Sequence, residues 1–93
     1  MGIPLKALLI EDSEDDALLL VRHIDRGGYD LEYIRVYTAD DVRKALADES
    51  WDIVISDYSM PNFTGRDALK VLHETDLDIP FIIISGTIGE EIA

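Results

Sequence analysis

Apolar positions gather in short blocks along the chain, and the spacing within each block predicts its secondary structure. Residues 5–10, "LKALLI", form a nearly continuous apolar run that is typical of a strand buried on both faces. A helix is predicted next, because Ser13 and Asp16 resemble a capping box and the pair Gly27 and Gly28 supplies a stop signal. Between these signals, apolar residues recur at helical spacing at Ala17, Leu18, Val21 and Ile24.

The same cycle of strand and helix then repeats. Residues 31–37, "LEYIRVY", predict a second strand, and residues 51–56, "WDIVIS", predict a third. A loop rich in turn-forming residues, "DYSMPNFTG" at 57–65, follows the third strand. The run "FIIIS" at 81–85 predicts a fourth buried strand. The two intervening helices are marked by apolar positions on one side, namely Ala39, Val42, Ala45 and Leu46 in one and Ala68, Leu69, Val71 and Leu72 in the other.

This alternation predicts the fold class. Strands that alternate with helices of this length imply parallel pairing through right-handed crossovers. We therefore expect an α/β fold, an open parallel sheet of about four strands with three full helices distributed over both faces. A chain of 93 residues can form one such domain. Ligands of open α/β sheets bind beyond the carboxyl ends of the strands, so functional side chains are expected there.

Charge and composition narrow the range of partners. The net charge is -12 with only eight Lys and Arg residues, which disfavours direct binding to nucleic acid or to an anionic membrane surface. Cysteine is absent, which removes disulfides and thiolate chemistry and fits a reducing compartment. The sequence contains no transmembrane run and no cleavable signal. We therefore expect a cytoplasmic protein without a membrane partner.

Polar side chains stand at the predicted carboxyl ends of three strands, as Glu11, Asp12, Asp57 and Ser85. Carboxylates brought together repel one another, so a fold that gathers them usually supplies a cation. A set made only of oxygen ligands suits Mg²⁺ or Mn²⁺ better than zinc. In such a site Asp57 is the candidate nucleophile on phosphorus, and Asp12 is the direct metal ligand. Glu11 would act through water and the Ser85 hydroxyl as a donor to the phosphoryl group.

Three separated motifs, "LLIEDS", "IVISDYSMPNFTG" and "IPFIIISGT", occur in this order over nearly the whole chain. Together they resemble the receiver domain of two-component response regulators, which has a flavodoxin-like fold. The resemblance implies that Asp57 is the phosphoacceptor, that Glu11 and Asp12 are the acidic pair, and that Ser85 is the hydroxyl switch residue. It also implies that the backbone carbonyl of Ser59 completes a Mg²⁺ site.

The resemblance further implies the partners. The family takes its phosphoryl group from a histidine kinase or a phosphotransfer protein and passes the change to an output domain or effector protein. The chain would then not be an enzyme, beyond self-phosphorylation from small donors and slow autodephosphorylation.

The chain departs from the family pattern near its C-terminus. Receiver domains have a fifth strand that ends in a Lys contacting the phosphoryl group, and this sequence stops at Ala93, before that strand. We therefore expect residues 1–93 to be a single, incomplete receiver domain. The apolar edge "FIIIS" would then be exposed and would favour a dimer through the fourth strand.

Two other functions are consistent with parts of the sequence. An aspartyl-phosphate phosphatase of the haloacid dehalogenase type would need a second Asp two residues after the nucleophile, and Ser59 stands at that position. A receiver-like interaction module that is not phosphorylated would keep the fold and the metal site without the family's Lys.

Overall fold

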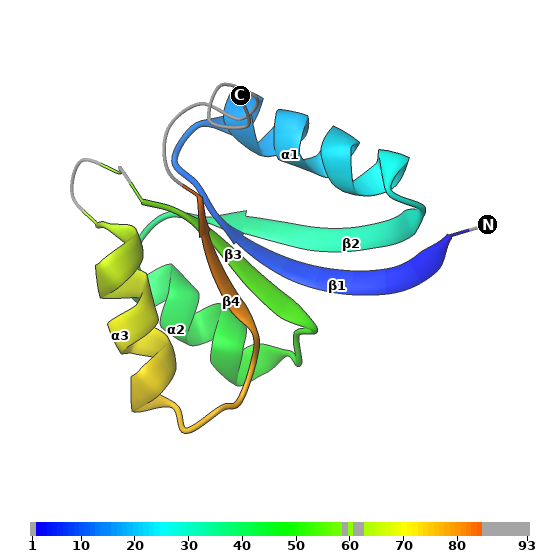
Figure 1. Ribbon diagram of the computed structural model, residues 1–93. Coiled ribbons are helices and arrows are strands. Elements are labelled where there is room, and N and C mark those ends of the chain that lie inside the picture. Colours follow the sequence, from blue (N-terminus) through cyan, green and yellow to red (C-terminus); the bar gives the residue numbers. More distant parts are fainter. Residues whose placement is uncertain (1, 59, 61–62, 85–93) are drawn as a thin grey trace.

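The computed structural model describes residues 2–58, 60 and 63–84 and contains one parallel sheet in the strand order β2-β1-β3-β4. Strands and helices alternate along the chain, as the sequence predicts (Figure 1). Their bounds are β1 (Ile3–Ile10), α1 (Glu14–Arg26), β2 (Tyr29–Val36), α2 (Ala39–Asp48), β3 (Ile53–Asp57), α3 (Gly65–Glu74) and β4 (Phe81–Ile84).

Helices cover both faces of this sheet, with α1 on one face and α2 and α3 on the other (Figure 1). In the sheet, β1 and β3 lie at the centre, with β2 beside β1 and β4 beside β3. One hydrophobic cluster lies beneath α1 and is formed by Ala7, Leu9, Ala17 and Ile55. A larger cluster lies beneath α2 and α3 and includes Leu8, Ile10, Val36, Val42, Leu46, Val54, Ala68, Val71 and Leu72.

Side chains at the helix starts explain where the helices begin. The Ser13 hydroxyl accepts a hydrogen bond from the amide of Asp16 at 3.3 Å, which confirms half of the predicted capping box. The amide of Ser13 donates to the Glu11 carboxylate instead, at 3.1 Å. A complete capping box occurs at α3, where Thr64 and Asp67 each accept from the other's backbone amide. The start of α1 is thus tied directly to a predicted site residue.

Two expectations about burial are wrong. Leu18 was expected on the buried side of α1, but 43% of it is exposed, and Leu20 packs on the sheet instead. The apolar run of β4 predicted a buried strand, but Ile82 and Ile83 are 47% and 38% exposed, which agrees instead with the exposed edge that the resemblance to receiver domains implied. Among the described residues only β3 pairs with β4, so β4 forms an edge of the sheet. An apolar run alone does not reveal whether a strand is central or lies at an edge.

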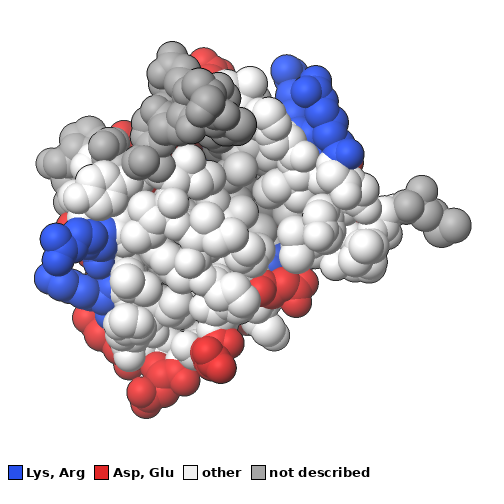
Figure 2. All heavy atoms as spheres, in the orientation of Figure 1, with Lys and Arg blue, Asp and Glu red and all other residues white. Residues whose placement is uncertain are grey.

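The charged side chains lie around the margins of the face that contains β4. Figure 2 shows Lys and Arg at the sides of this view and Asp and Glu along its lower edge, with a central area free of charge where β4 lies in Figure 1. The predicted dimer through the edge formed by β4 stays a prediction.

Within the described part of the chain, no helix is both long enough and apolar enough to cross a membrane.

Candidate functional site

The acidic residues meet because β1 and β3 are neighbours in the sheet. Ile10 pairs with Ser56 in the parallel register, so the next residues, Glu11 and Asp57, lie side by side at the carboxyl end of the two strands. Carboxylate oxygens of Glu11, Asp12 and Asp57 all lie within 4.8 Å of one another. The structure therefore brings together three of the predicted site residues, from segments 46 positions apart in the sequence.

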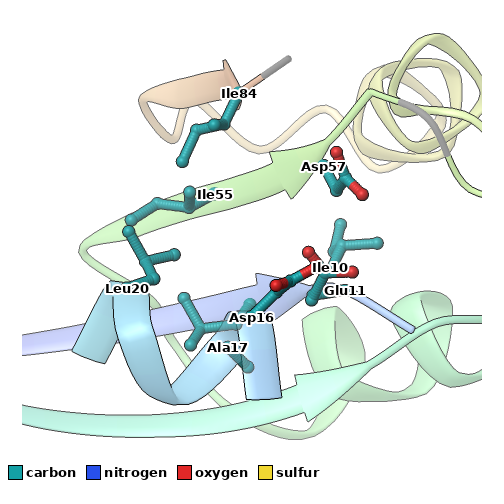
Figure 3. A pocket seen from close by; sticks show the side chains of 9 residues that line it. Ile10, Glu11, Asp16, Ala17, Leu20, Ile55, Asp57 and Ile84 are labelled. Atoms are coloured by element: carbon teal, nitrogen blue, oxygen red, sulfur yellow. The ribbon is translucent and has the colours of Figure 1, made fainter. Parts of the chain in front are cut away.

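Alternation along the strands determines which face carries the site. Leu9 and Ile55 point toward α1, and side chains two residues further along a strand return to the same face. Glu11 and Asp57 therefore project toward the start of α1. They line a pocket there together with Asp16, while apolar side chains form its inner wall (Figure 3). Asp16 is a lining residue that the sequence analysis did not predict.

The environment of Glu11 favours its protonated form. Burial raises the pKa of the Glu11 carboxyl from 4.5 to about 7, and the hydrogen bond with Asp12 and the charges of Asp57 and Asp16 act in the same direction. The hydrogen bond from the Ser13 amide acts against them. The site without a cation therefore favours protonation of this carboxyl, and a cation would favour the charged form.

Backbone hydrogen bonds fix the segments that carry these acids. The Glu11 amide donates to the Val36 carbonyl at 2.9 Å, which ties the end of β1 to β2. The Tyr58 amide donates to the Ile84 carbonyl at 2.8 Å, which ties the end of β3 to β4. An Arg35 nitrogen donates to the Glu11 carbonyl at 3.1 Å and to the Asp12 carbonyl at 3.5 Å. The carboxylates thus project from backbone that neighbouring strands hold in place.

Gly65 supports the site through its lack of a side chain. A Cβ at this position would lie 3.2 Å from the Asp57 carbonyl oxygen and 3.2 Å from the Tyr58 Cα. Among the glycines of the described segments only Gly28 has a positive φ. Gly65 therefore allows α3 to approach the end of β3 closely, and its role does not depend on unusual backbone angles.

The donor set fits a hard divalent cation. Three carboxylates offer only oxygen ligands, and one of them, Asp12, is exposed to solvent, so that water and phosphate oxygens could share the coordination sphere. Glu11 and Asp57 are partly buried. The other two predicted site residues, Ser59 and Ser85, lie outside the described residues.

Comparison with known proteins agrees with this geometry. The family model of the response regulator receiver domain matches residues 7–93. The chain belongs to the response regulator receiver family. This receiver domain is 36% identical over 84 residues to the C4-dicarboxylate transport transcriptional regulatory protein DctD of Pseudomonas aeruginosa. It is also 36% identical over 80 residues to the sensor kinase CckA of Brucella abortus.

The receiver domain corresponds to a small part of these relatives. The match to DctD covers 87% of this chain and 17% of DctD, and the match to CckA covers 85% of this chain and 8% of CckA. Among solved structures, a mutant of the response regulator MaeR bound to sulfate is similar with a TM-score of 0.76 and 22% identity. That match covers 96% of this chain and 73% of the MaeR chain. The structural likeness confirms the predicted flavodoxin-like fold.

The sequence analysis also missed Arg35. It lies inside β2 as a half-buried cation, one residue before the last residue of that strand. The signal in the sequence is a cation among the apolar residues at the end of this strand. Its meaning becomes clear only once β2 is paired with β1, because Arg35 then lies close to the acidic residues that follow β1.

Proposed function

We propose that this receiver domain accepts a phosphoryl group on Asp57 in a Mg²⁺-dependent reaction and thereby switches a protein-interaction surface. The observation that carries the proposal is the cluster of Glu11, Asp12 and Asp57, whose carboxylate oxygens lie within 4.8 Å of one another. Bound Mg²⁺ or Mn²⁺ would supply charge neutralisation for the carboxylates and for the incoming phosphoryl group.

The transfer step requires a nucleophile and a leaving group. An Asp57 carboxylate oxygen attacks phosphorus and forms an acyl phosphate, while the bond between phosphorus and the donor breaks. The electron pair of that bond leaves with the imidazole of a phosphohistidine or with acetate when acetyl phosphate is the donor. Asp12 and Glu11 would hold the cation beside this oxygen. The Ser59 carbonyl would add a ligand to the cation, and the Ser85 hydroxyl would donate to the phosphoryl group.

The relatives support the choice of partners. DctD is named as a transcriptional regulatory protein and CckA as a sensor kinase, so similar domains occur within proteins of both kinds. We propose a histidine kinase or phosphotransfer protein as the donor and an output domain or effector protein as the recipient of the signal. On this proposal the domain works in the cytoplasm and does not act as an enzyme on external substrates.

Phosphorylation can be tested by intact mass. The chain is incubated with acetyl phosphate and Mg²⁺, and we expect the mass of one phosphoryl group to be added to it. Asp57→Asn should abolish the addition. Asp52→Asn is the matched control, because Asp52 directly precedes β3, at the end opposite Asp57, and its oxygen accepts from the Lys6 amide, a bond that Asn can keep.

Metal binding is measured separately by NMR. Mn²⁺ should broaden the signals of Glu11, Asp12 and Asp57 before those of Asp52. Phosphorylation that survives Asp57→Asn would contradict the assignment of the phosphoacceptor. Binding of Mn²⁺ without any mass change under all donor conditions would contradict the proposed phosphorylation of this chain and leave a metal-binding module.

A further inference from the structure

We infer that Arg35 is a positioning residue that holds the backbone of Glu11 and Asp12 in the geometry required for cation binding. The inference rests on the proposed function, because it concerns the same acidic cluster. Arg35 touches neither the cation nor the phosphoryl group in this proposal. It acts through the main chain of the two acidic residues.

The contacts of Arg35 connect two strands at the edge of the site. In the parallel register Arg35 pairs with Leu9, so its side chain lies on the α1 side of the sheet, the side that carries Glu11. Its Nη1 donates to the Glu11 carbonyl at 3.1 Å and to the Asp12 carbonyl at 3.5 Å. One cationic nitrogen therefore bridges two consecutive carbonyls at the point where the chain leaves β1.

A second contact restricts the guanidinium itself. The Arg35 Cζ lies 5.4 Å from the centre of the Tyr37 ring, within the range of a cation-π interaction. Arg35 is half-buried, whereas Tyr37 is 48% exposed. The ring and the carbonyls together leave the guanidinium few alternative positions.

These contacts complete a clamp on the acidic segment. The Glu11 amide already donates to the Val36 carbonyl of β2, and Arg35 then holds the carbonyl side of the same residue. Backbone fixed on both sides directs the carboxylates of Glu11 and Asp12 toward Asp57 at little further entropic cost. Residues that orient metal ligands in this way usually contribute measurably to metal affinity.

Because Arg35 is charged, the direction in which Mg²⁺ affinity changes on its removal tests its role. A cation near the site repels Mg²⁺, so removing it should tighten Mg²⁺ binding if charge were its only influence. If Arg35 positions the ligands, removing it should weaken binding in spite of the lost repulsion. The two roles therefore predict opposite changes in the dissociation constant.

The experiment compares Mg²⁺ titrations of the unmodified chain and of Arg35→Met, which keeps a long apolar side chain without donors. We expect Arg35→Met to weaken Mg²⁺ binding about tenfold, at the lower end of the usual effect of such orienting residues. Arg35→Lys restores one cationic donor and should recover part of the affinity. Arg26→Met is the control, since Arg26 lies in the last turn of α1 and the variant has the same change in net charge.

Hydrogen exchange of the metal-free protein provides a readout that does not depend on the cation. The amide of Glu11 should exchange faster in Arg35→Met than in the unmodified chain and in Arg26→Met. Equal exchange rates, or tighter Mg²⁺ binding by Arg35→Met, would overturn the inference. If the unmodified chain bound no Mg²⁺, the proposed function would fail, while the exchange rates would still decide whether Arg35 holds this segment.

Discussion

Glu11→Gln should stabilise the metal-free protein at neutral and higher pH. The Glu11 carboxyl lies beside Asp12 and Asp57, and its pKa is raised to about 7 mainly by burial. Gln stays neutral at every pH and can still accept the hydrogen bond from the Ser13 amide. The substitution therefore removes an unfavourable charge and keeps the neighbouring contact.

The size of the effect follows from the pKa. A rise in pKa from 4.5 to about 7 corresponds to an upper limit of about 3.5 kcal/mol, at about 1.4 kcal/mol for each pH unit. The carboxyl is only half-buried, so solvent screens much of this penalty. We expect Glu11→Gln to raise the free energy of unfolding by about 1 to 2 kcal/mol once the pH exceeds 7.

The pH dependence distinguishes this explanation from a general effect of the substitution. Because the pKa is higher in the folded state, the protonated carboxyl favours folding below pH 4.5, and this contribution is lost as the pH rises through about 7. Glu11→Gln and the unmodified chain should therefore converge in stability near pH 4.5 and separate progressively up to pH 7. Urea unfolding in the presence of a chelator, repeated across this range, measures the difference.

Glu14→Gln serves as the control, because Glu14 is an exposed acid in the first turn of α1. Its loss should give no gain in stability at neutral pH, since a negative charge there favours the helix. A difference between Glu11→Gln and the unmodified chain that stays constant from pH 4.5 to pH 8 would refute the argument. It would mean that the charge of Glu11 is not what the fold opposes.

Two further substitutions test the backbone around the site and at the end of α3. Gly65→Ala should lower the free energy of unfolding by about 1 kcal/mol, because the new Cβ would press on the carbonyl of Asp57. A higher melting temperature of this variant would show that β3 and α3 can separate at no cost. Asp76 has a positive φ of 60°, so Asp76→Ala should lower the free energy of unfolding by about 1 kcal/mol while Asp76→Gly leaves it unchanged. Equal melting temperatures of these two variants would contradict strain at this position.

Much of the fold follows from sequence because its signals are local. The alternation of apolar blocks and turn residues predicted each strand and helix. The position of the acids directly after the predicted strands indicated that they would gather at the carboxyl end of the sheet. Glu11, Asp12 and Asp57 could be brought together on paper because parallel strands end at the same edge of a sheet. The structure adds the register of Ile10 with Ser56, which places Glu11 directly beside Asp57.

The missed features depend on packing between distant segments. The helical spacing of Leu18 is as regular as that of Leu20, and only the angle at which α1 lies on the sheet decides which of them is buried. The role of Arg35 depends on its pairing with Leu9 across two strands. The space requirement at Gly65 arises from the approach of α3 to β3. No single stretch of sequence contains these relations.

The strand order has a consequence for how the domain can assemble during synthesis. In chain order, β2 lies beside β1, β3 lies on the other side of β1, and β4 lies beside β3. Each strand that emerges from the ribosome can therefore join an open edge, and none has to be inserted between two strands that are already paired. Glu11, Asp12 and Asp57 all precede β4 in the chain. Nascent chains that end shortly after α3 thus already contain all three carboxylates, and β4 then ties the end of β3 in place through the Tyr58 amide.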